Sequence, residues 1–338
     1  KEQTRRERGR LMEDRFRRRI DYLRMSITDR CNLRCLYCMP PQGVTSRTRD
    51  EILRMEEILR VAEVAIQLGI NKFRLTGGEP LLRKGVIPFI RSLALLPGVE
   101  DIAVTTNGTL LLELGEQLQD AGVKRLNISL DTLDSEKFNR ITRGGNLKQV
   151  WDGIEKALEI GFAPVKLNIV ALRNFNDREW ADFAHLTLDY PLHVRFIELM
   201  PIGTSWTMAG DSFVSCEEIM SVIEQELGEL NPAKSGVRGS GPAEYYTLPN
   251  SKGSIGFIHA MSNHFCADCN RLRLTADGKL RPCLHDQHEV DIREALRSGA
   301  GDRELQQLFH KAVALKPANH HLATGAPEAG RGMCQIGG

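Results

Sequence analysis

The sequence lacks several features that would place it in a broad class at once. It has no apolar run of the roughly 18 or more residues that a membrane-spanning helix needs. Its 45 basic and 44 acidic residues leave a net charge of +1, so no global field attracts nucleic acid. No secretory signal is visible. We therefore expect a cytoplasmic protein, or a mitochondrial matrix protein in a eukaryote, with no membrane or nucleic-acid partner.

Charge is crowded in one place only, the first twenty residues. Eight arginines lie there: Arg5, Arg6, Arg8, Arg10, Arg15, Arg17, Arg18 and Arg19. We expect residues 1–20 to form a solvated leading segment or helix, with a targeting remnant or a partner contact as the alternative. The remaining length is enough for one large core with an appendage.

Cysteine is scarce, but its spacing is informative. Six of the eight cysteines form two compact triplets, and Cys216 and Cys334 are left over as expected ordinary thiols. In a chain of this length without a visible signal, metal or cofactor binding is favoured over a secreted disulfide framework. The triplets are Cys31, Cys35 and Cys38, then Cys266, Cys269 and Cys283.

The first triplet follows an extended apolar stretch, residues 22–28, and has three and then two residues between its cysteines. Thiolates hold iron–sulfur clusters, or zinc when a fourth ligand is available. The next cysteine is Cys216, so three local thiolates would leave one iron of a four-iron cluster open. A structural zinc knot and a set of core cysteines are the alternatives.

Short apolar or β-branched runs alternate with amphipathic stretches between residues 22 and 199. This order predicts right-handed crossovers and a parallel sheet, which a doubly wound sheet and a barrel both satisfy. The expected strands are 22–28, 72–75, 101–105, 125–130, 165–170 and 193–199, and the expected helices are 55–68, 84–94, 110–121, 147–159 and 177–186.

The rhythm ends near Pro201. Residues 215–226 predict a helix with Ser215 as its N-cap, and the Gly-, Pro- and Ser-rich stretch 228–249 predicts a linker into a smaller module. That module holds the second triplet, for which His285 or His288 could complete a zinc site.

Basic residues recur on the expected strands. Each one alone is more often a surface position or an ion pair, but repetition over several strands favours a polyanion such as a triphosphate. Next to the second triplet, Arg271 and Arg273 alternate with leucines, so an extended segment would present both on one face. The strand residues are Arg24, Lys72, Arg74, Lys166 and Arg195.

The Cys31-x3-Cys35-x2-Cys38 motif, with Tyr37 before its last cysteine, resembles the signature of the radical S-adenosylmethionine (SAM) enzymes. From about Tyr22 to Gly338 the chain resembles the GTP 3',8-cyclases, which open molybdenum cofactor biosynthesis. The resemblance implies an α/β fold: a partial (βα)6 TIM-type barrel with a C-terminal module that carries a second iron–sulfur cluster. We expect a basic segment at 1–20, the barrel at 21–229 and the module at 230–338.

The resemblance also implies a set of site residues. Each triplet would bind a [4Fe–4S] cluster. SAM would contact Tyr37, Gly78, Ser129 and Met200, and the Gly337-Gly338 end would reach the site and assist turnover. GTP would contact Arg24, Lys72, Arg74, Thr105, Lys166, Arg195, Arg271 and Arg273.

The implied reaction is a radical cyclisation. Reductive SAM cleavage gives a 5'-deoxyadenosyl radical that takes hydrogen from C3' of GTP, and the ribose radical then attacks C8 of guanine. The implied partners are GTP, a one-electron reductant, the downstream cyclic pyranopterin monophosphate synthase and, in a homodimer, a second copy of the chain. Another radical SAM enzyme with an auxiliary cluster, such as a peptide maturase, and a non-catalytic metal-binding protein are the alternatives.

Overall fold

The structure is a computed structural model that describes residues 12–45, 47–203, 210–233, 241–263, 265–320 and 331–337. The arginines at positions 5–10, most of the expected linker's centre (234–240) and Gly338 lie outside these described residues. Among the helices in the described segments, none combines the length and the apolar character needed to cross a membrane.

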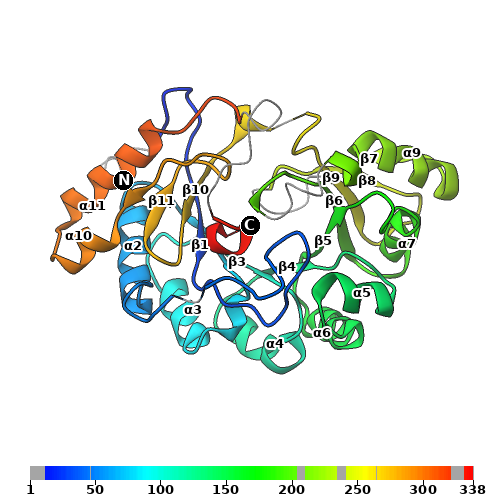
Figure 1. Ribbon diagram of the computed structural model, residues 1–338, viewed down its shortest axis with the longest axis horizontal. Coiled ribbons are helices and arrows are strands. Elements are labelled where there is room, and N and C mark those ends of the chain that lie inside the picture. The colour runs from blue at the N-terminus through cyan, green and yellow to red at the C-terminus, as the bar shows by residue number, and fades with distance from the viewer. Residues whose placement is uncertain are drawn as a thin grey trace, which may run out of the picture.

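Six parallel strands form the centre of the sheet, as expected from the alternating pattern. They are β1 (Tyr22–Ser26), β2 (Lys72–Thr76), β3 (Asp101–Thr106), β4 (Arg125–Ser129), β5 (Val165–Ala171) and β6 (Leu192–Glu198). They pair in chain order, each parallel to the next. Figure 1 shows them as an open arc with helices on its outer side, which confirms the partial-barrel fold.

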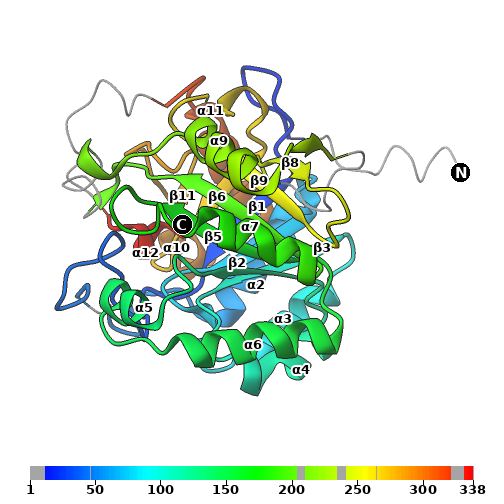
Figure 2. The same ribbon diagram turned by 90° about the vertical axis from the view of Figure 1, so that its right-hand side faces the viewer.

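The helices between these strands cover the outer face. Figure 2 views the arc from the side, with α4 and α6 below the strands and α9 above them. Apolar side chains on alternate strand positions, such as Leu126 and Ile128, pack into this helical layer and are fully buried. The helices are α2 (Met55–Gln67), α3 (Val86–Ala94), α4 (Leu111–Asp120), α6 (Leu147–Ile160) and α7 (Trp180–Asp189).

One helical boundary differs from the sequence pattern, and one helix was not expected at all. The expected start at residue 177 is wrong, because Asp177 closes a turn by accepting a hydrogen bond from the Asn174 amide at 2.9 Å, and α7 begins at Trp180. Helix α5 (Ser135–Thr142) was not expected. Its N-cap is Asp134, whose carboxylate accepts from the Lys137 amide at 2.8 Å.

The C-terminal strands extend the same sheet at both edges. Strand β9 (Ser254–Ile258) is parallel to β6, and β10 (Arg271–Leu274) is parallel to β1. Antiparallel strands complete each edge: β8 (Glu244–Thr247) and β7 (Asn231–Pro232) beyond β9, then β11 (Lys279–Arg281) and β12 (Val290–Asp291) beyond β10. The boundary at 229/230 stays a prediction, but strands from both sides of it form one sheet of twelve.

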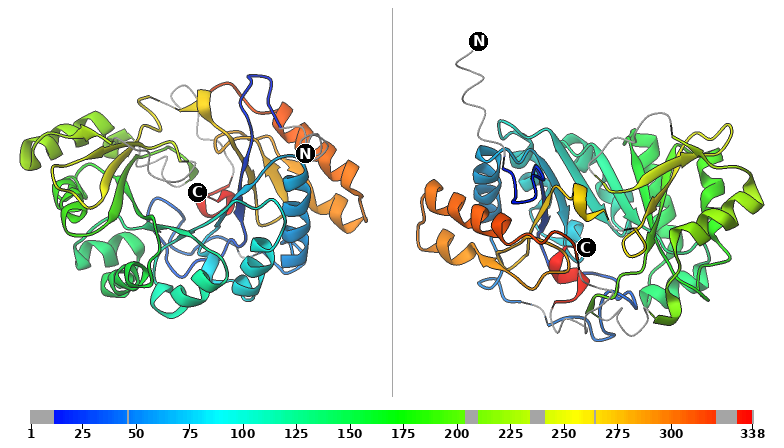
Figure 3. Two further views of the ribbon diagram at one scale, coloured as in Figure 1. Left: turned by 180° about the vertical axis from the view of Figure 1, so that it is seen from behind. Right: turned by 90° about the horizontal axis from the view of Figure 1, so that it is seen from above.

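The remaining helices belong to the second half of the chain. Ser215 caps α9 (Cys216–Leu227) through a hydrogen bond from the Glu218 amide at 3.3 Å, as expected. Helix α11 (Asp302–Ala314) packs against β11 and β12, and α10 (Arg293–Arg297) packs against α11. The short α12 (Met333–Ile336) lies inside the arc in Figure 1 and in both views of Figure 3.

The expected solvated leading segment is found only in part in the described residues 12–20, where Arg15, Arg17 and Arg19 are exposed. Met12 and Ile20 are buried in the core. Arg18 is only 7% exposed, and its guanidinium donates to Asp14 at 2.6 Å and to the carbonyls of Cys266 and Pro317 at 2.7 and 2.6 Å. A buried guanidinium needs such partners. This stretch is therefore part of the fold.

Candidate functional site

One cavity collects most of the residues singled out in the sequence. It runs inside the arc of parallel strands and includes their carboxyl ends, where βα barrels carry their chemistry. Both cysteine triplets line it, although more than 220 positions separate Cys31 from Cys266. Because β10 is parallel to β1, with Arg271 beside Tyr22, the second triplet lies at the amino end of these strands and the first follows the carboxyl end of β1, so the triplets lie at opposite ends of the cavity.

The loop that follows β1 presents the first triplet to this cavity. The Leu33 amide points at the Cys31 sulfur at 3.4 Å, and the Asn107 side-chain amide lies 3.8 Å from the same sulfur. Arg143 donates to the carbonyls of Arg34 and Met39 at 2.8 and 3.0 Å and so fastens the loop. Three converging thiols with N–H donors around them fit a [4Fe–4S] cluster, whose sulfurs accept such bonds.

The turn after β2 packs backbone to backbone against this loop. The Gly78 amide donates to the Thr28 carbonyl at 2.8 Å, and the Glu79 amide donates to the Arg30 carbonyl at 2.8 Å. A Cβ placed on Gly78 would lie 2.2 Å from the Arg30 carbonyl oxygen. Glycine is therefore required here for contact with the cysteine loop, independently of any ligand.

The residues expected to contact SAM all line the cavity: Tyr37, Gly78, Ser129 and Met200. The Tyr37 hydroxyl donates to Asp131 at 2.6 Å, and the Val170 amide donates to the same carboxylate at 2.9 Å. Burial raises the pKa of Asp131 to about 6 against these bonds. Sequence reasoning passed over Asp131, although it stands two residues after Ser129 in the same strand motif.

The register of the sheet places three arginines abreast on the inner face. Arg24 on β1 is paired with Arg273 on β10 and with Arg74 on β2, and neighbouring strands lie about 4.8 Å apart. Burial and repulsion from Arg271 lower the pKa of Arg273 to about 9, and burial with repulsion from Arg273 and Arg74 lowers the pKa of Arg24 well below its ordinary value. A row of buried like charges is costly without an anion, so this row favours a polyanionic ligand.

Other predicted substrate residues extend this positive surface. Arg271, Arg195 and Thr105 line the cavity. Arg195 donates to the side chain of Asn127 at 2.7 Å. Within the described part of the chain, the Nε atoms of Arg74 and Arg195 and the Thr105 hydroxyl are buried without a hydrogen-bond partner. Such groups are expected to find a partner in a ligand or in water.

Two predicted basic residues do not line the cavity. Lys72 forms an ion pair with Asp21 at 2.7 Å near the amino end of β2. Lys166 is 2% exposed, and burial followed by repulsion from Arg195, Arg125 and Arg74 lowers its pKa to about 6. Lys166 therefore lies behind the lining, within the field of the arginines.

The second triplet comes from two loops: Cys266 and Cys269 lie between β9 and β10, and Cys283 follows β11. Lys316 is buried and points at the Cys269 sulfur at 3.4 Å while donating to the carbonyls of Arg271 and Pro282, both at 2.8 Å. Burial would raise the pKa of Cys269, but Arg271 and Lys316 lower it to about 6. A thiolate held in this way fits a metal ligand.

The two histidines proposed as zinc ligands are placed differently. His285 lines the cavity with the cysteines, whereas His288 is exposed and bonded to Asp286 at 2.5 Å. Sequence reasoning missed Arg18 and Lys316 as supports of the two loops, because no local pattern links them to the cysteines.

The segment 331–337 enters the same cavity. Met333 and Cys334 line it, and the thiols of Cys334 and Cys38 are hydrogen-bonded. Cys334 is thus buried beside Cys38, and its expected character as an ordinary thiol stays a prediction. Arg273 donates to the Gly337 carbonyl, and a Cβ on Gly337 would lie 2.8 Å from Thr76.

A third group of metal-type ligands exists among the described residues: Glu198, Cys216 and His259. Both Glu198 oxygens are already used. One accepts from the Cys216 amide at 3.0 Å and from the Ser262 hydroxyl, and the other accepts from the amides of Met261 and Ser262 at 2.7 and 2.9 Å. Glu198 therefore acts as a structural anion that joins β6 to the loop before the second triplet.

Two family models match the chain. The model described as Radical SAM superfamily covers residues 25–187, and the model described as Molybdenum Cofactor Synthesis C covers residues 192–322. Their border falls between β5 and β6, so the matched region of the second model includes the last barrel strand as well as the second triplet.

The chain is 53% identical to the GTP 3',8-cyclase of Pelotomaculum thermopropionicum and 53% identical to that of Moorella thermoacetica. Both alignments cover 97% of this chain and all of the relative. Among solved structures, Streptococcus suis SuiB bound to S-adenosylmethionine is similar with a TM-score of 0.59 and 11% identity, over 85% of this chain and 68% of SuiB. That likeness concerns the fold.

Proposed function

The chain belongs to the GTP 3',8-cyclase family of radical SAM enzymes, which acts in molybdenum cofactor biosynthesis, and we propose that the cavity lined by both triplets converts GTP to (8S)-3',8-cyclo-7,8-dihydroguanosine 5'-triphosphate. The observation that carries this proposal is the shared cavity, in which two cysteine triplets face a row of buried arginines. A peptide maturase would not need that row, and a metal scaffold would not need the cavity.

Cys31, Cys35 and Cys38 would hold the first cluster. With SAM bound, that cluster supplies the reducing electron and the power to abstract hydrogen. The chain's part is to orient SAM: Tyr37, fixed by Asp131, would border its methionine end, Gly78 its amino group, and Ser129 and Met200 its adenosine. The buried walls would exclude water from the reacting atoms.

Arg24, Arg74, Arg195, Arg271 and Arg273 would bind GTP. Guanidinium forks match phosphate oxygens, and the Nε–H groups of Arg74 and Arg195, which lack a hydrogen-bond partner, are suited to donate to such oxygens. Thr105 would add a hydroxyl donor. Lys166, when protonated, would add positive charge from behind the cavity lining. Lys72 would act on GTP binding indirectly, through its ion pair with Asp21.

Cys266, Cys269 and Cys283 would hold a second [4Fe–4S] cluster next to the purine. The support for it is the donor set: three cavity-lining thiols, one with a depressed pKa, on loops braced by Lys316 and Arg18. A one-electron reductant, the downstream cyclic pyranopterin monophosphate synthase and a homodimer remain predicted partners, and a cytoplasmic location remains a prediction. The Gly337-Gly338 end would assist turnover.

The test is an anaerobic assay. The protein is reconstituted with iron and sulfide, reduced with dithionite and given SAM with GTP, and 5'-deoxyadenosine and the cyclised nucleotide are measured by mass spectrometry. The proposal expects both products with GTP and little of either with ATP. SAM cleavage that is independent of GTP, with no cyclised nucleotide, would refute it.

Iron content separates the two cluster assignments. Cys35→Ala and Cys269→Ala should each lower the iron content by about four atoms per chain, because each removes one ligand of a different cluster. Cys216→Ala is the matched control, since Cys216 is a buried free cysteine that is not among the residues lining the cavity. Zinc in place of iron at the second triplet after anaerobic purification would contradict the second cluster.

A further inference from the structure

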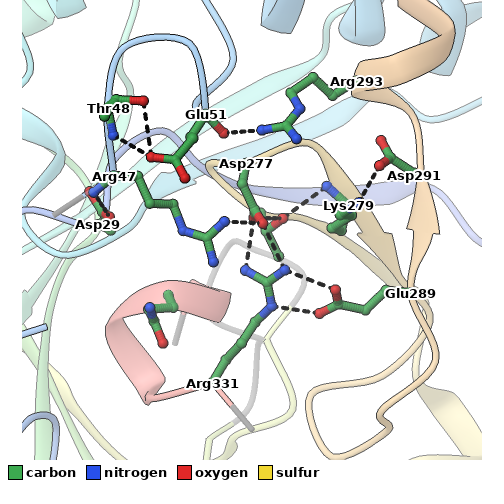
Figure 4. Close-up of polar contacts among 12 residues, drawn as sticks. Asp29, Arg47, Thr48, Glu51, Asp277, Lys279, Glu289, Asp291, Arg293 and Arg331 are labelled. Carbon is green, nitrogen blue, oxygen red and sulfur yellow. Dashed lines mark hydrogen bonds and ion pairs between the residues drawn. The ribbon is translucent and has the colours of Figure 1, made fainter. Parts of the chain in front are cut away.

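The segment 331–337 reaches the cavity from one anchored residue. We propose that Arg331 is the positioning residue that holds this segment between the two triplets during the reaction. The inference rests on the proposed function, since it assumes that the segment assists turnover there. Figure 4 shows Arg331 between two carboxylates, Asp277 and Glu289, at the root of the segment.

The anchor is a doubled bidentate pair. The Arg331 guanidinium donates from Nη1 and Nη2 to the two Asp277 oxygens, both at 2.8 Å. Its Nε and Nη2 reach the two Glu289 oxygens at 2.7 and 2.8 Å. The Asp277 side chain is only 4% exposed and that of Arg331 only 16%. Fork-to-fork pairs with this little exposure are among the strong polar contacts of proteins.

The two carboxylates are also held in place by residues other than Arg331. Asp277 accepts from the Thr275 hydroxyl at 2.6 Å and pairs with Arg47, while Glu289 pairs with Arg281 at 2.6 Å. Burial opposes the charge of Asp277, but Arg331 and Thr275 bring its pKa down to about 2. Asp277 lies in the turn between β10 and β11, and Glu289 directly precedes β12, so the edge of the sheet formed by β10, β11 and β12 carries the anchor.

Only Gly332 separates this anchor from the part of the segment inside the cavity. A Cβ on Gly332 would lie 3.4 Å from the Cys38 carbonyl and 3.8 Å from the Cys334 sulfur. The next residues form α12, whose side chains at Cys334 and Ile336 are 2% exposed, and the Gly337 carbonyl accepts from Arg273. Because the connection is one residue long, loss of the anchor would free α12 to leave.

Helix α12 is too short to keep its conformation without support from the rest of the chain. It is four residues long, which is far below the length at which an isolated helix is stable in water. The Arg273 contact with Gly337 would also compete with a phosphate ligand for the same guanidinium. Arg331 therefore keeps the segment in register when substrate takes Arg273.

The experiment compares Arg331→Ala, Arg331→Lys and Glu289→Gln with the unmodified, cluster-loaded protein. Arg173→Ala is the matched control, because Arg173 forms a bidentate pair with Glu218 at 2.9 and 2.8 Å on α9, outside the cavity lining. Hydrogen–deuterium exchange of the peptide that contains residues 331–337 reports the position of the segment. Cyclised nucleotide and 5'-deoxyadenosine are measured separately in the same samples.

In Arg331→Ala, hydrogen–deuterium exchange of the 331–337 peptide should be at least about tenfold faster. The yield of cyclised nucleotide should fall at least about tenfold. A tenfold change corresponds to a loss of only about 1.4 kcal/mol. Arg331→Lys should lie between, because one ammonium cannot form two forks. Glu289→Gln should shift both readouts in the same direction, which keeps the test decisive if Arg331→Ala does not fold.

Unchanged exchange in Arg331→Ala and Glu289→Gln would overturn the anchoring. Faster exchange with undiminished cyclised nucleotide would overturn the positioning role while leaving the cyclase assignment intact. If the unmodified chain forms no cyclised nucleotide from GTP, the proposed function fails instead, and the role in reaction fails with it.

Discussion

Lys166 is the residue whose replacement should separate stability from function. Its side chain is 2% exposed, and its ammonium lies 5.5 Å from the ring centre of Tyr245. Burial first, and then Arg195, Arg125 and Arg74, lower its pKa from an ordinary 10.5 to about 6. At pH 7 the lysine is therefore mostly neutral in the folded protein and charged in the unfolded chain.

This difference opposes folding. A lysine whose folded pKa is depressed costs nothing above its unfolded pKa, and the cost grows as the pH falls from 10.5 towards 6. Each pH unit in that window corresponds to about 1.4 kcal/mol, so the cost at pH 7 is on the order of a few kcal/mol. Lys166→Met keeps the volume and removes the charge.

We expect Lys166→Met to raise the free energy of unfolding by about 1–3 kcal/mol at pH 7, with a gain that shrinks as the pH rises towards 10. Thermal denaturation over a pH series measures it. Lys148→Met is the matched control, because the Lys148 side chain is 79% exposed and should change stability little. A Met variant no more stable than the unmodified protein would refute the assigned burial cost.

The same residue should couple proton uptake to nucleotide binding. A triphosphate beside the arginine cluster would favour the charged lysine and raise its pKa, so GTP binding should take up protons at pH 7–8 and weaken as the pH rises. Calorimetric titrations in two buffers with different ionisation enthalpies measure this uptake. The Lys166→Met variant should bind GTP more weakly, and most of the proton uptake on binding should be lost. Equal proton uptake by both proteins would show that another group titrates.

Three further substitutions test the supports of the site. Gly78→Ala should lose iron from the first cluster, because the added Cβ would lie 2.2 Å from the Arg30 carbonyl oxygen, while Gly301→Ala, with open space around its Cβ, should retain it; iron assays compare them. Arg18→Ala should lower the free energy of unfolding by about 2–3 kcal/mol and release iron from the second cluster, because the carbonyls of Cys266 and Pro317 would lose their hydrogen-bond donor. Urea unfolding measures the stability and electron paramagnetic resonance measures the cluster. An intact second-cluster signal would contradict this prediction. Gly337→Ala should expel α12, because the residue has φ +71° and its Cβ would meet Thr76 at 2.8 Å; unaltered hydrogen exchange in the 331–337 peptide would argue against this.

The sequence determined the parts of this protein that depend on neighbouring residues. Alternation placed all six barrel strands within about two residues of their observed bounds, because period-two burial is a local property of a strand. The spacing of Cys31, Cys35 and Cys38 on a loop after a strand predicted a cluster site in the same way. The alternation of Arg271 and Arg273 with buried leucines was also readable from the chain alone.

Only the tertiary structure decided which distant segments meet. The parallel pairing of β10 with β1 set Arg273 beside Arg24 and turned the two cysteine triplets towards one cavity. Lys72 and Lys166 look alike in the sequence, yet one is paired with Asp21 and the other is buried among arginines. Likewise, the residues near Cys334 do not predict its contact with Cys38, almost 300 positions away. Those near Arg331 do not predict its pair with Asp277, more than 50 positions away. Such contacts are fixed by strand pairing and side-chain packing across the whole chain, which no local pattern encodes.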